Sequence, residues 1–207
     1  KFGFNPDESF VVPEDVGAHF RELRDIGEQK EAAWNELFAS YKQAHPELAA
    51  DFERRVNRAL PDGWKDALPR FTPDPKGAAT RKHSGTMLNA IAPIVTDLIG
   101  GSADLTPSNN TWLNCASDFQ KDTPVGRYLR FGVREHGMSA VINGIFAHGM
   151  LRPFGATFMN FIGYAMGAVR LSALNRFGVL YVATHYSIGL GEDGPTHQPI
   201  AMVAALL

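Results

Sequence analysis

Apolar residues recur every three or four positions through the first part of the chain, separated by residues that are mostly charged. This period is typical of amphipathic α-helices, and Pro13 suits a first-turn position. The apolar positions of the first helix are Val16, Phe20, Leu23, Ile26, Trp34, Leu37, Phe38 and Tyr41. A second helix is predicted from Pro46, with Phe52, Val56 and Leu60 in register. A narrow apolar stripe beside a charged face favours a helical appendage or interdomain arm over a catalytic role.

The pattern changes after residue 60. Residues 61–79, PDGWKDALPRFTPDPKGAA, are rich in Pro and Gly and are predicted to form a linker. From residue 80 onward, short apolar runs alternate with helical periods, and Thr80 is a candidate cap for a helix over 81–94. Strands are predicted at LIGGSAD, YLRFG, LRPFGATF and VLYVATH, and further helices at REHGMSAVINGIFAHG, NFIGYAMGAVRLSALN and the end of the chain. This alternation predicts an α/β fold, a mostly parallel sheet with helices on both faces, preceded by a helical arm.

The composition limits the classes of binding partner and the cellular compartment that are expected. A net charge of −2 gives no bias toward nucleic acid or an anionic membrane. The single cysteine, Cys115, excludes an internal disulfide framework and indicates a reducing compartment, so a cytoplasmic protein is expected. The sequence contains neither a recognisable signal peptide nor an apolar run long enough for a membrane span. Because Lys1 is not Met and the last helix lacks a cap, we interpret the chain as the middle of a longer protein.

The densest group of ionisable residues is HYSIGLGEDGPTHQ, residues 185–198, which follows the last predicted strand. This is where an α/β sheet presents its ligands, and the loop offers groups that grip polar substrates and move protons. A zinc site built from His185, Glu192, Asp193 and His197 is disfavoured, because no HxxxH or HExxH spacing is present. The absence of G-x-S-x-G and GxxxxGK[ST] motifs argues against a serine hydrolase and a P-loop NTPase.

Two further patterns each have a structural and a functional interpretation. Glu135 begins a predicted helix, where acids are common; alternatively it is a buried carboxyl that bonds a ligand nitrogen. Phe158, Phe161 and Tyr164 lie three residues apart, which predicts one side of a helix. They form either an ordinary core stripe or the wall of a pocket for a flat heteroaromatic ring.

A polar turn supplies the third candidate. Residues 100–109, GGSADLTPSN, follow a predicted strand, and their Ser, Thr and Asn side chains and backbone can cradle an anion. Arg81 adds a rigid positive fork suited to phosphate. A turn that merely joins two elements has a similar composition.

Four long segments together resemble one family. IGGSADLTPSN, RYLRFGVREHGM, FGATFMNFIGYAMGAVRLSAL and ATHYSIGLGEDGPTHQP are similar to the thiamine-diphosphate-dependent transketolases, particularly fungal ones. The opening KFGFNPDESFVVP resembles the stretch between that family's first two domains, so the likeness covers nearly the whole chain. It implies that residues 80–207 are a C-terminally incomplete pyrimidine-binding domain. Residues 1–60 would be the helical tail of the diphosphate-binding domain and the interdomain arm, with residues 61–79 as the linker.

The resemblance also implies an activity: transfer of a two-carbon ketol unit from a ketose phosphate to an aldose phosphate, in a homodimer with the cofactor at its interface. Glu135 matches the catalytic glutamate that bonds the aminopyrimidine ring, and His197 a histidine near the cofactor. The remaining implied cofactor contacts are Asp104, Phe158, Phe161 and Tyr164. The implied substrate ligands are Arg81, Ser108, His185, Asp193 and His197.

The sequence departs from the family pattern in two ways. The family has THDSIG where this chain has Tyr186 after His185, which changes the loop that carries His185. The GDG…N motif that holds the divalent cation, magnesium or calcium, is absent. We therefore expect no metal site in this chain, a cation bound by an N-terminal domain outside it, and no turnover by these residues alone. Two other functions stay open: a dihydroxyacetone synthase that uses formaldehyde as acceptor, and a non-catalytic thiamine-fold module that dimerises or regulates.

Overall fold

The computed structural model describes residues 3–187, 189–191 and 193–206. The chain forms two compact units, Lys1–Asp51 and Phe52–Leu207, with the boundary inside helix α2, Pro46–Val56. Among the described residues, no helix is both long enough and apolar enough to cross a membrane.

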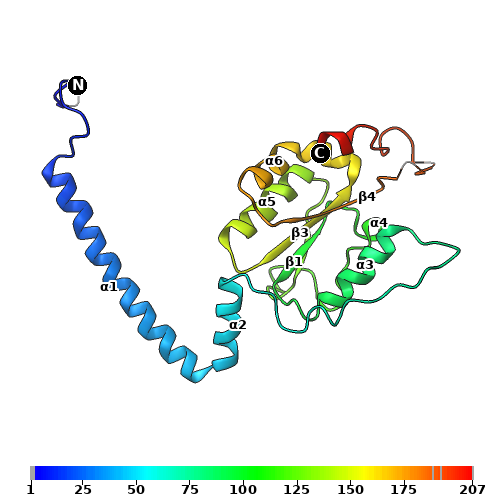
Figure 1. The fold of residues 1–207 in the computed structure, drawn as a ribbon, viewed down its shortest axis with the longest axis horizontal. Helices are drawn as coiled ribbons and strands as arrows, with labels where there is room; N and C mark the ends of the chain where they lie inside the picture. Colours follow the sequence, from blue (N-terminus) through cyan, green and yellow to red (C-terminus); the bar gives the residue numbers. More distant parts are fainter. Residues whose placement is uncertain (1–2, 188, 192, 207) are drawn as a thin grey trace. The chain divides into compact units, whose positions relative to one another are not determined.

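The first unit is dominated by helix α1, Glu14–Ala44, which Figure 1 shows as a single long helix. Pro13 is its N-cap residue, and Glu14 and Asp15 occupy the first turn, where acidic side chains stabilise a helix electrostatically. The predicted apolar stripe is present but exposed within this unit; Trp34 stacks on Phe38 with ring centroids 5.1 Å apart.

The second unit is built on four parallel strands in the order β2-β1-β3-β4. The strands are β1 (Leu98–Ser102), β2 (Tyr128–Arg130), β3 (Arg152–Phe158) and β4 (Leu180–Thr184). The helices are α3 (Thr80–Ile91), α4 (Thr106–Asn109), α5 (Glu135–His148), the 3-10 helix η1 (Met159–Ala165), α6 (Met166–Leu174) and α7 (Met202–Leu206). The prediction of a parallel sheet with helices on both faces is confirmed.

Helices cover both faces of the sheet. In Figure 1, α5 and α6 lie on one side of the strands and α3 and α4 on the other. Met138 and Ile142 of α5 pack over Gly155 in β3. The opposite face carries the core cluster of Ala92, Val95, Leu98, Leu113, Tyr128 and Phe154, against which Leu88 and Ile91 of α3 pack. Because both faces of the central strands β1 and β3 are buried, these strands read as short runs without polar alternation, whereas the edge strands β2 and β4 are partly exposed.

The strand order fixes where a ligand can bind. The chain passes from β1 to β2 on one side and then crosses to β3 on the other side of β1, so the winding direction reverses between β1 and β3. In an open parallel sheet, this reversal leaves a crevice at the carboxyl ends of the two strands. The segments that follow Ser102 of β1 and Phe158 of β3 are therefore the expected walls of a site.

Four local predictions were wrong. Leu60, predicted in register with the second helix, lies beyond the end of α2 at Val56. Thr80 is the first residue of α3 rather than its cap; the cap position is Ala79, and α3 ends at Ile91 instead of residue 94. Pro93 lacks the N–H that a continuing helix needs, which accounts for the earlier end. The predicted helix over NFIGYAMGAVRLSALN is divided into η1 and α6.

Candidate functional site

The predicted site residues lie where the four strands end. Asp104 follows β1, Glu135 follows β2, Phe158 is the last residue of β3, and His185 comes directly after β4. Asp104 and His185 have left-handed backbone angles, with φ of 60° and 57°. These sharp turns redirect the chain as it leaves the sheet, at a small conformational cost.

The three aromatic residues form a ladder, although not on one helix as predicted. Phe158 ends β3, whereas Phe161 and Tyr164 belong to η1, whose period of three residues keeps them on the same side. The rings of Phe158 and Phe161 are stacked with centroids 5.5 Å apart and an interplanar angle of 15°. Tyr164 continues the row at 6.2 Å from Phe161 and is 73% exposed. The row thus runs from the core to the surface.

The His197 ring contacts two of the three aromatic residues in this row. Its ring meets the edges of Phe158 and Phe161 at centroid distances of 5.7 and 5.2 Å. The loop that carries it is tied to η1, because Asn160 Nδ2 donates to the carbonyl of Thr196. The His197 imidazole therefore lies against the same two rings that the sequence predicted as a pocket wall.

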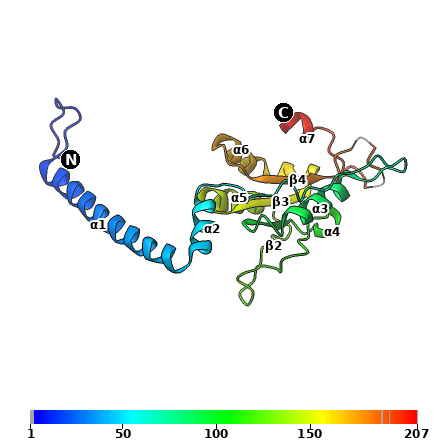
Figure 2. The same cartoon turned by 60° about the horizontal axis from the view of Figure 1, so that its bottom comes forward.

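His185 and Arg81 form a second group of side chains in contact with Phe158. The His185 imidazole packs on the Phe158 ring with centroids 3.7 Å apart, and Arg81 Nη1 lies 2.8 Å from His185 Nε2. Arg81 is in the first turn of α3, and Figures 1 and 2 show the loops before α3 and after β4 extending from the same end of the sheet. The pocket between them has a volume of about 490 Å³, and Thr80 and Tyr186 also line it.

The surroundings of His185 favour its neutral form. Burial lowers the pKa of the imidazole below its ordinary value of 6.5, and the positive charges of Arg81 and His197 lower that pKa further. Asp193 acts in the opposite direction and raises the pKa. At neutral pH the pocket therefore presents a guanidinium beside an uncharged ring.

Glu135 is both the first residue of a helix and buried, so it meets part of each sequence interpretation. It begins α5 and is 8% exposed. Among the described residues, its carboxylate has no hydrogen-bond or ion-pair partner. Helix α5 packs against η1, which carries two of the aromatic rings. Its carboxylate oxygens are not among the fully buried polar atoms without a partner, so they stay open to a ligand or solvent.

The anion cradle predicted for residues 100–109 is largely wrong. Ser102, Thr106 and Asn109 are buried, and their side chains are used in bonds to the protein itself. Ser108 stays partly exposed and Asp104 is exposed. Among the described residues, neither contacts Arg81, His185 or Phe158. Their predicted roles are therefore supported only by their position at the same edge of the sheet.

Sequence reasoning missed the roles of Asn109 and Thr184. Both are buried, Asn109 Nδ2 lies 2.7 Å from Thr184 Oγ1, and Thr184 Oγ1 lies 2.9 Å from His185 Nδ1. The two residues are 75 positions apart, so the sequence around either one does not indicate that they form a hydrogen bond. The parallel order of β1 and β4 around β3 could have indicated that these strand ends share one edge.

No group of three or more His, Cys, Asp or Glu side chains capable of holding a metal ion occurs in the described part of the chain. Asp193 is exposed in the loop after β4. Glu192, which was also considered as a ligand, lies outside the described residues.

Comparison with known families and proteins gives consistent matches. Residues 76–207 match the family described as transketolase, pyrimidine binding domain, and residues 1–61 match transketolase, thiamine diphosphate binding domain. A transketolase of Scheffersomyces stipitis is 53% identical over 210 residues, and a probable transketolase of Schizosaccharomyces pombe is 50% identical over 208 residues. These alignments cover 99% and 98% of this chain, but only 31% and 30% of the relatives.

Solved structures agree. A transketolase from Pichia stipitis, crystallised in complex with sedoheptulose 7-phosphate, has a TM-score of 0.92 and 52% identity, covering 99% of this chain and 31% of its own. The transketolase from Leishmania mexicana has a TM-score of 0.91 and 49% identity, covering 99% and 30%. The chain thus spans about a third of the length of its relatives. Since the first family covers more than half of its residues, this chain belongs to the transketolase pyrimidine-binding domain family.

Proposed function

We propose that this chain forms the pyrimidine-binding and phosphate-binding parts of a transketolase, which transfers a two-carbon ketol unit from a ketose phosphate to an aldose phosphate. The family membership supports this activity, and so does the likeness to transketolases over both the sequence and the fold.

One observation carries the proposal: the Phe158 ring is shared by two groups of side chains. It stacks on Phe161 and also packs against His185, which contacts Arg81. A flat heteroaromatic ring and a phosphate group would therefore bind next to each other. This is the arrangement that a thiamine enzyme acting on phosphorylated sugars requires.

The residues fit the pyrimidine ring of thiamine diphosphate. Phe158, Phe161 and Tyr164 supply aromatic surface for a planar ring, which favours offset or edge contacts. The buried carboxyl of Glu135 is proposed to hold a proton against a ring nitrogen. Bound thiamine diphosphate would supply the carbon nucleophile and the electron sink for the transferred unit.

Substrate binding is assigned to the second of these groups, Arg81 and His185. Arg81 offers a planar fork suited to two phosphate oxygens, and His185 adds a second group at 2.8 Å from it. Ser108 is a further hydroxyl at the same edge of the sheet. We propose that Asp193 and His197, on the loop after β4, bond hydroxyl groups of the sugar, and that Asp104 lies near the cofactor.

Other parts of the enzyme belong to the proposal as well. We propose a cytoplasmic homodimer with the cofactor at the subunit interface. The divalent cation, magnesium or calcium, would be bound by residues outside this chain and would hold the diphosphate. Equilibrium sedimentation with and without cofactor, and metal analysis of the complete enzyme, test these points.

The decisive experiment is a pair of variants in the complete enzyme, assayed with xylulose 5-phosphate as donor and either ribose 5-phosphate or formaldehyde as acceptor. Glu135→Gln should lower kcat by about a hundredfold or more, because the proton held at the ring is lost. Arg81→Ala should mainly raise KM for phosphorylated donors, whereas Lys82→Ala at the next, exposed position should have little effect.

Three outcomes would contradict the proposal. If Glu135→Gln kept full activity, a non-catalytic thiamine-fold module would be favoured. If formaldehyde were preferred to ribose 5-phosphate, the enzyme would be a dihydroxyacetone synthase. Equal loss in Arg81→Ala with phosphorylated and unphosphorylated donors would remove the assigned phosphate site.

A further inference from the structure

Asn109 joins the ends of three strands through one side chain. It is 0% exposed, and its Oδ1 accepts a hydrogen bond of 2.7 Å from Ser102 Oγ of β1. Its Nδ2 donates to the carbonyl of Thr157 in β3 at 3.2 Å and to Thr184 Oγ1 in β4 at 2.7 Å. The Thr157 carbonyl can only accept, so the amide nitrogen must face it, and the orientation of the Asn109 amide is fixed.

The hydrogen-bond partners of His185 then determine which of its ring nitrogens carries the proton. Arg81 has no acceptor, so His185 Nε2 must accept from Arg81 Nη1 at 2.8 Å and cannot carry a proton there. A neutral imidazole has one N–H, which is then on Nδ1 and points at Thr184 Oγ1, 2.9 Å away. Thr184 Oγ1 thus accepts two hydrogen bonds, one from Asn109 and one from His185.

We propose that Asn109 and Thr184 are positioning residues, which hold His185 with its proton on Nδ1 so that Nε2 faces the phosphate pocket as a lone pair. This inference rests on the proposed function for the identity of the anion. A phosphate dianion that replaces the contact with Arg81 would meet that lone pair. Binding therefore brings one proton to Nε2, either from solvent or from the monoanionic form of the phosphate monoester itself.

The charges around His185 are consistent with proton uptake when phosphate binds. The charged or titratable groups acting on His185 are Arg81 from α3 and Asp193 and His197 from the loop after β4. Burial, Arg81 and His197 lower the pKa of His185, so the ring is neutral in the free enzyme. A bound dianion adds negative charge and raises that pKa, which makes the proton uptake a consequence of phosphate binding.

The first test reads the tautomer directly and needs no substrate. In the full-length protein labelled with 15N-histidine, the His185 signals are assigned from a His185→Gln variant. The wild type should show a protonated Nδ1. Because Arg81 itself opposes a proton on Nε2, the variants are compared in an Arg81→Ala background. There Thr184→Val, which keeps the shape and removes the hydroxyl, should shift His185 toward protonated Nε2, and Thr184→Ser should restore the protonated Nδ1. Asn109→Ala should resemble Thr184→Val, whereas Asn143→Ala removes a buried amide on α5, away from the pocket, and should change nothing.

The second test follows the proton. Titration calorimetry with inorganic phosphate near pH 8, where the free ligand is mostly the dianion, in buffers of different ionisation enthalpy, should show proton uptake in the wild type and much less in Thr184→Val. In the steady state, Thr184→Val should raise KM for phosphorylated donors about fivefold with little change in kcat, the effect of one lost hydrogen bond.

A protonated Nε2 in the free wild type would overturn the inference, as would unchanged proton uptake in Thr184→Val. If Asn109→Ala does not fold, the side-chain amide signals of Asn109 in the wild type provide the readout: they should move as His185 titrates, and no movement would remove Asn109 from the proposal. The tautomer is measured without turnover. A wrong prediction of the tautomer can therefore be distinguished from an absence of transketolase activity.

Discussion

Arg81 directs its guanidinium at Nε2 of His185 across 2.8 Å, although the two residues are 104 positions apart. One lies in the first turn of α3 and the other follows the edge strand β4. Burial of the imidazole and, after it, this neighbouring cation lower the pKa of His185.

The first prediction concerns stability in mild acid. The folded chain holds the pKa of His185 below 6.5, so the unfolded chain binds more protons as pH falls past that value. This contribution to the free energy of unfolding is therefore present above pH 6.5 and is lost as pH falls below that value toward the lowered pKa of the folded chain. Urea unfolding at several pH values should show a flatter profile in His185→Gln and in Arg81→Ala. An identical slope in all three proteins would contradict the lowered pKa.

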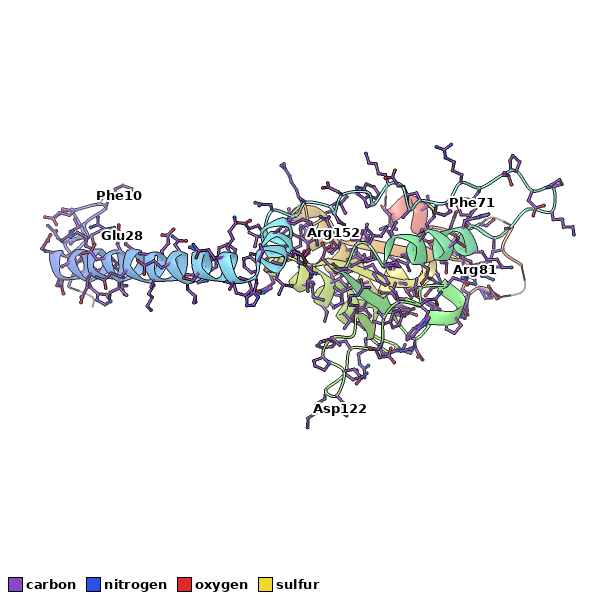
Figure 3. The ribbon with its side chains drawn as sticks, turned by 90° about the horizontal axis from the view of Figure 1, so that it is seen from below. Phe10, Glu28, Phe71, Arg81, Asp122 and Arg152 are labelled. Carbon is purple, nitrogen blue, oxygen red and sulfur yellow. The ribbon has the colours of Figure 1, made fainter. Side chains whose placement is uncertain are left out.

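The second prediction concerns the opposite end of the sheet. The carboxylate of Asp97 is 2% exposed and pairs with Arg54 Nη2 at 3.1 Å and with Arg152 Nε at 2.9 Å. Figure 3 shows Arg152 and Arg81 toward opposite ends of this unit. Asp97→Asn should lower the free energy of unfolding by about 3 kcal/mol, because it leaves arginine charges without their buried partner.

Asp118→Asn is the matched control for Asp97→Asn. Asp118 also pairs with an arginine, Arg130 at 2.9 Å, but both side chains are largely in contact with solvent. Its loss should cost less than about 1 kcal/mol. The turnover of folded Asp97→Asn enzyme should equal that of the wild type; a change in KM would mean that the two ends of the sheet are not independent.

The third prediction tests why β1 contains two glycines. A Cβ atom at Gly101 would overlap the carbonyl oxygen of Leu129 in the neighbouring strand. Gly101→Ala should therefore separate β1 from β2 and give insoluble or unfolded protein. Gly144→Ala, in the exposed face of α5 with open space around it, should instead stabilise the fold by about 0.5–1 kcal/mol. Thermal unfolding and soluble yield compare the two; normal folding of Gly101→Ala would disprove the strand register.

The fourth prediction concerns Tyr186, which lines the phosphate pocket and whose hydroxyl lies 3.3 Å from Thr80 Oγ1. Tyr186→Asp would place a carboxylate beside Arg81 and His185, where it competes with phosphate for the same charges. KM for phosphorylated donors should rise about two- to fivefold at low ionic strength, with less effect in high salt. Tyr186→Phe, which keeps the ring, should stay close to wild type. Equal effects of both variants would show that the phenol hydroxyl, not the charge, matters.

The fold was largely predictable because strands and helices here carry different periods and lengths. The four short apolar runs all became strands, and the helical runs between them became helices. Errors occurred where the same residue spacing is compatible with more than one type of secondary structure. A spacing of three residues at Phe158, Phe161 and Tyr164 suits an α-helix and a 3-10 helix alike, and the end of a strand does not interrupt it.

The structure brings together several of the predicted side chains at the strand ends, whereas the sequence did not indicate the residues that support them. The loop containing His185 was conspicuous because it is dense in ionisable groups. Asn109 was instead interpreted as part of an anion cradle, since its amide is chemically suited to that role. Only the packing of α4 against the strands shows that the amide is already satisfied by protein groups.

The shared position of Phe158 has a consequence for the order of events in catalysis. Phe158 contacts Phe161 and His185 at the same time, so a ligand that shifts its ring at one contact also changes the other. Cofactor occupancy and donor affinity would then be mutually reinforcing, and thermodynamic reciprocity requires each to strengthen the other by the same factor.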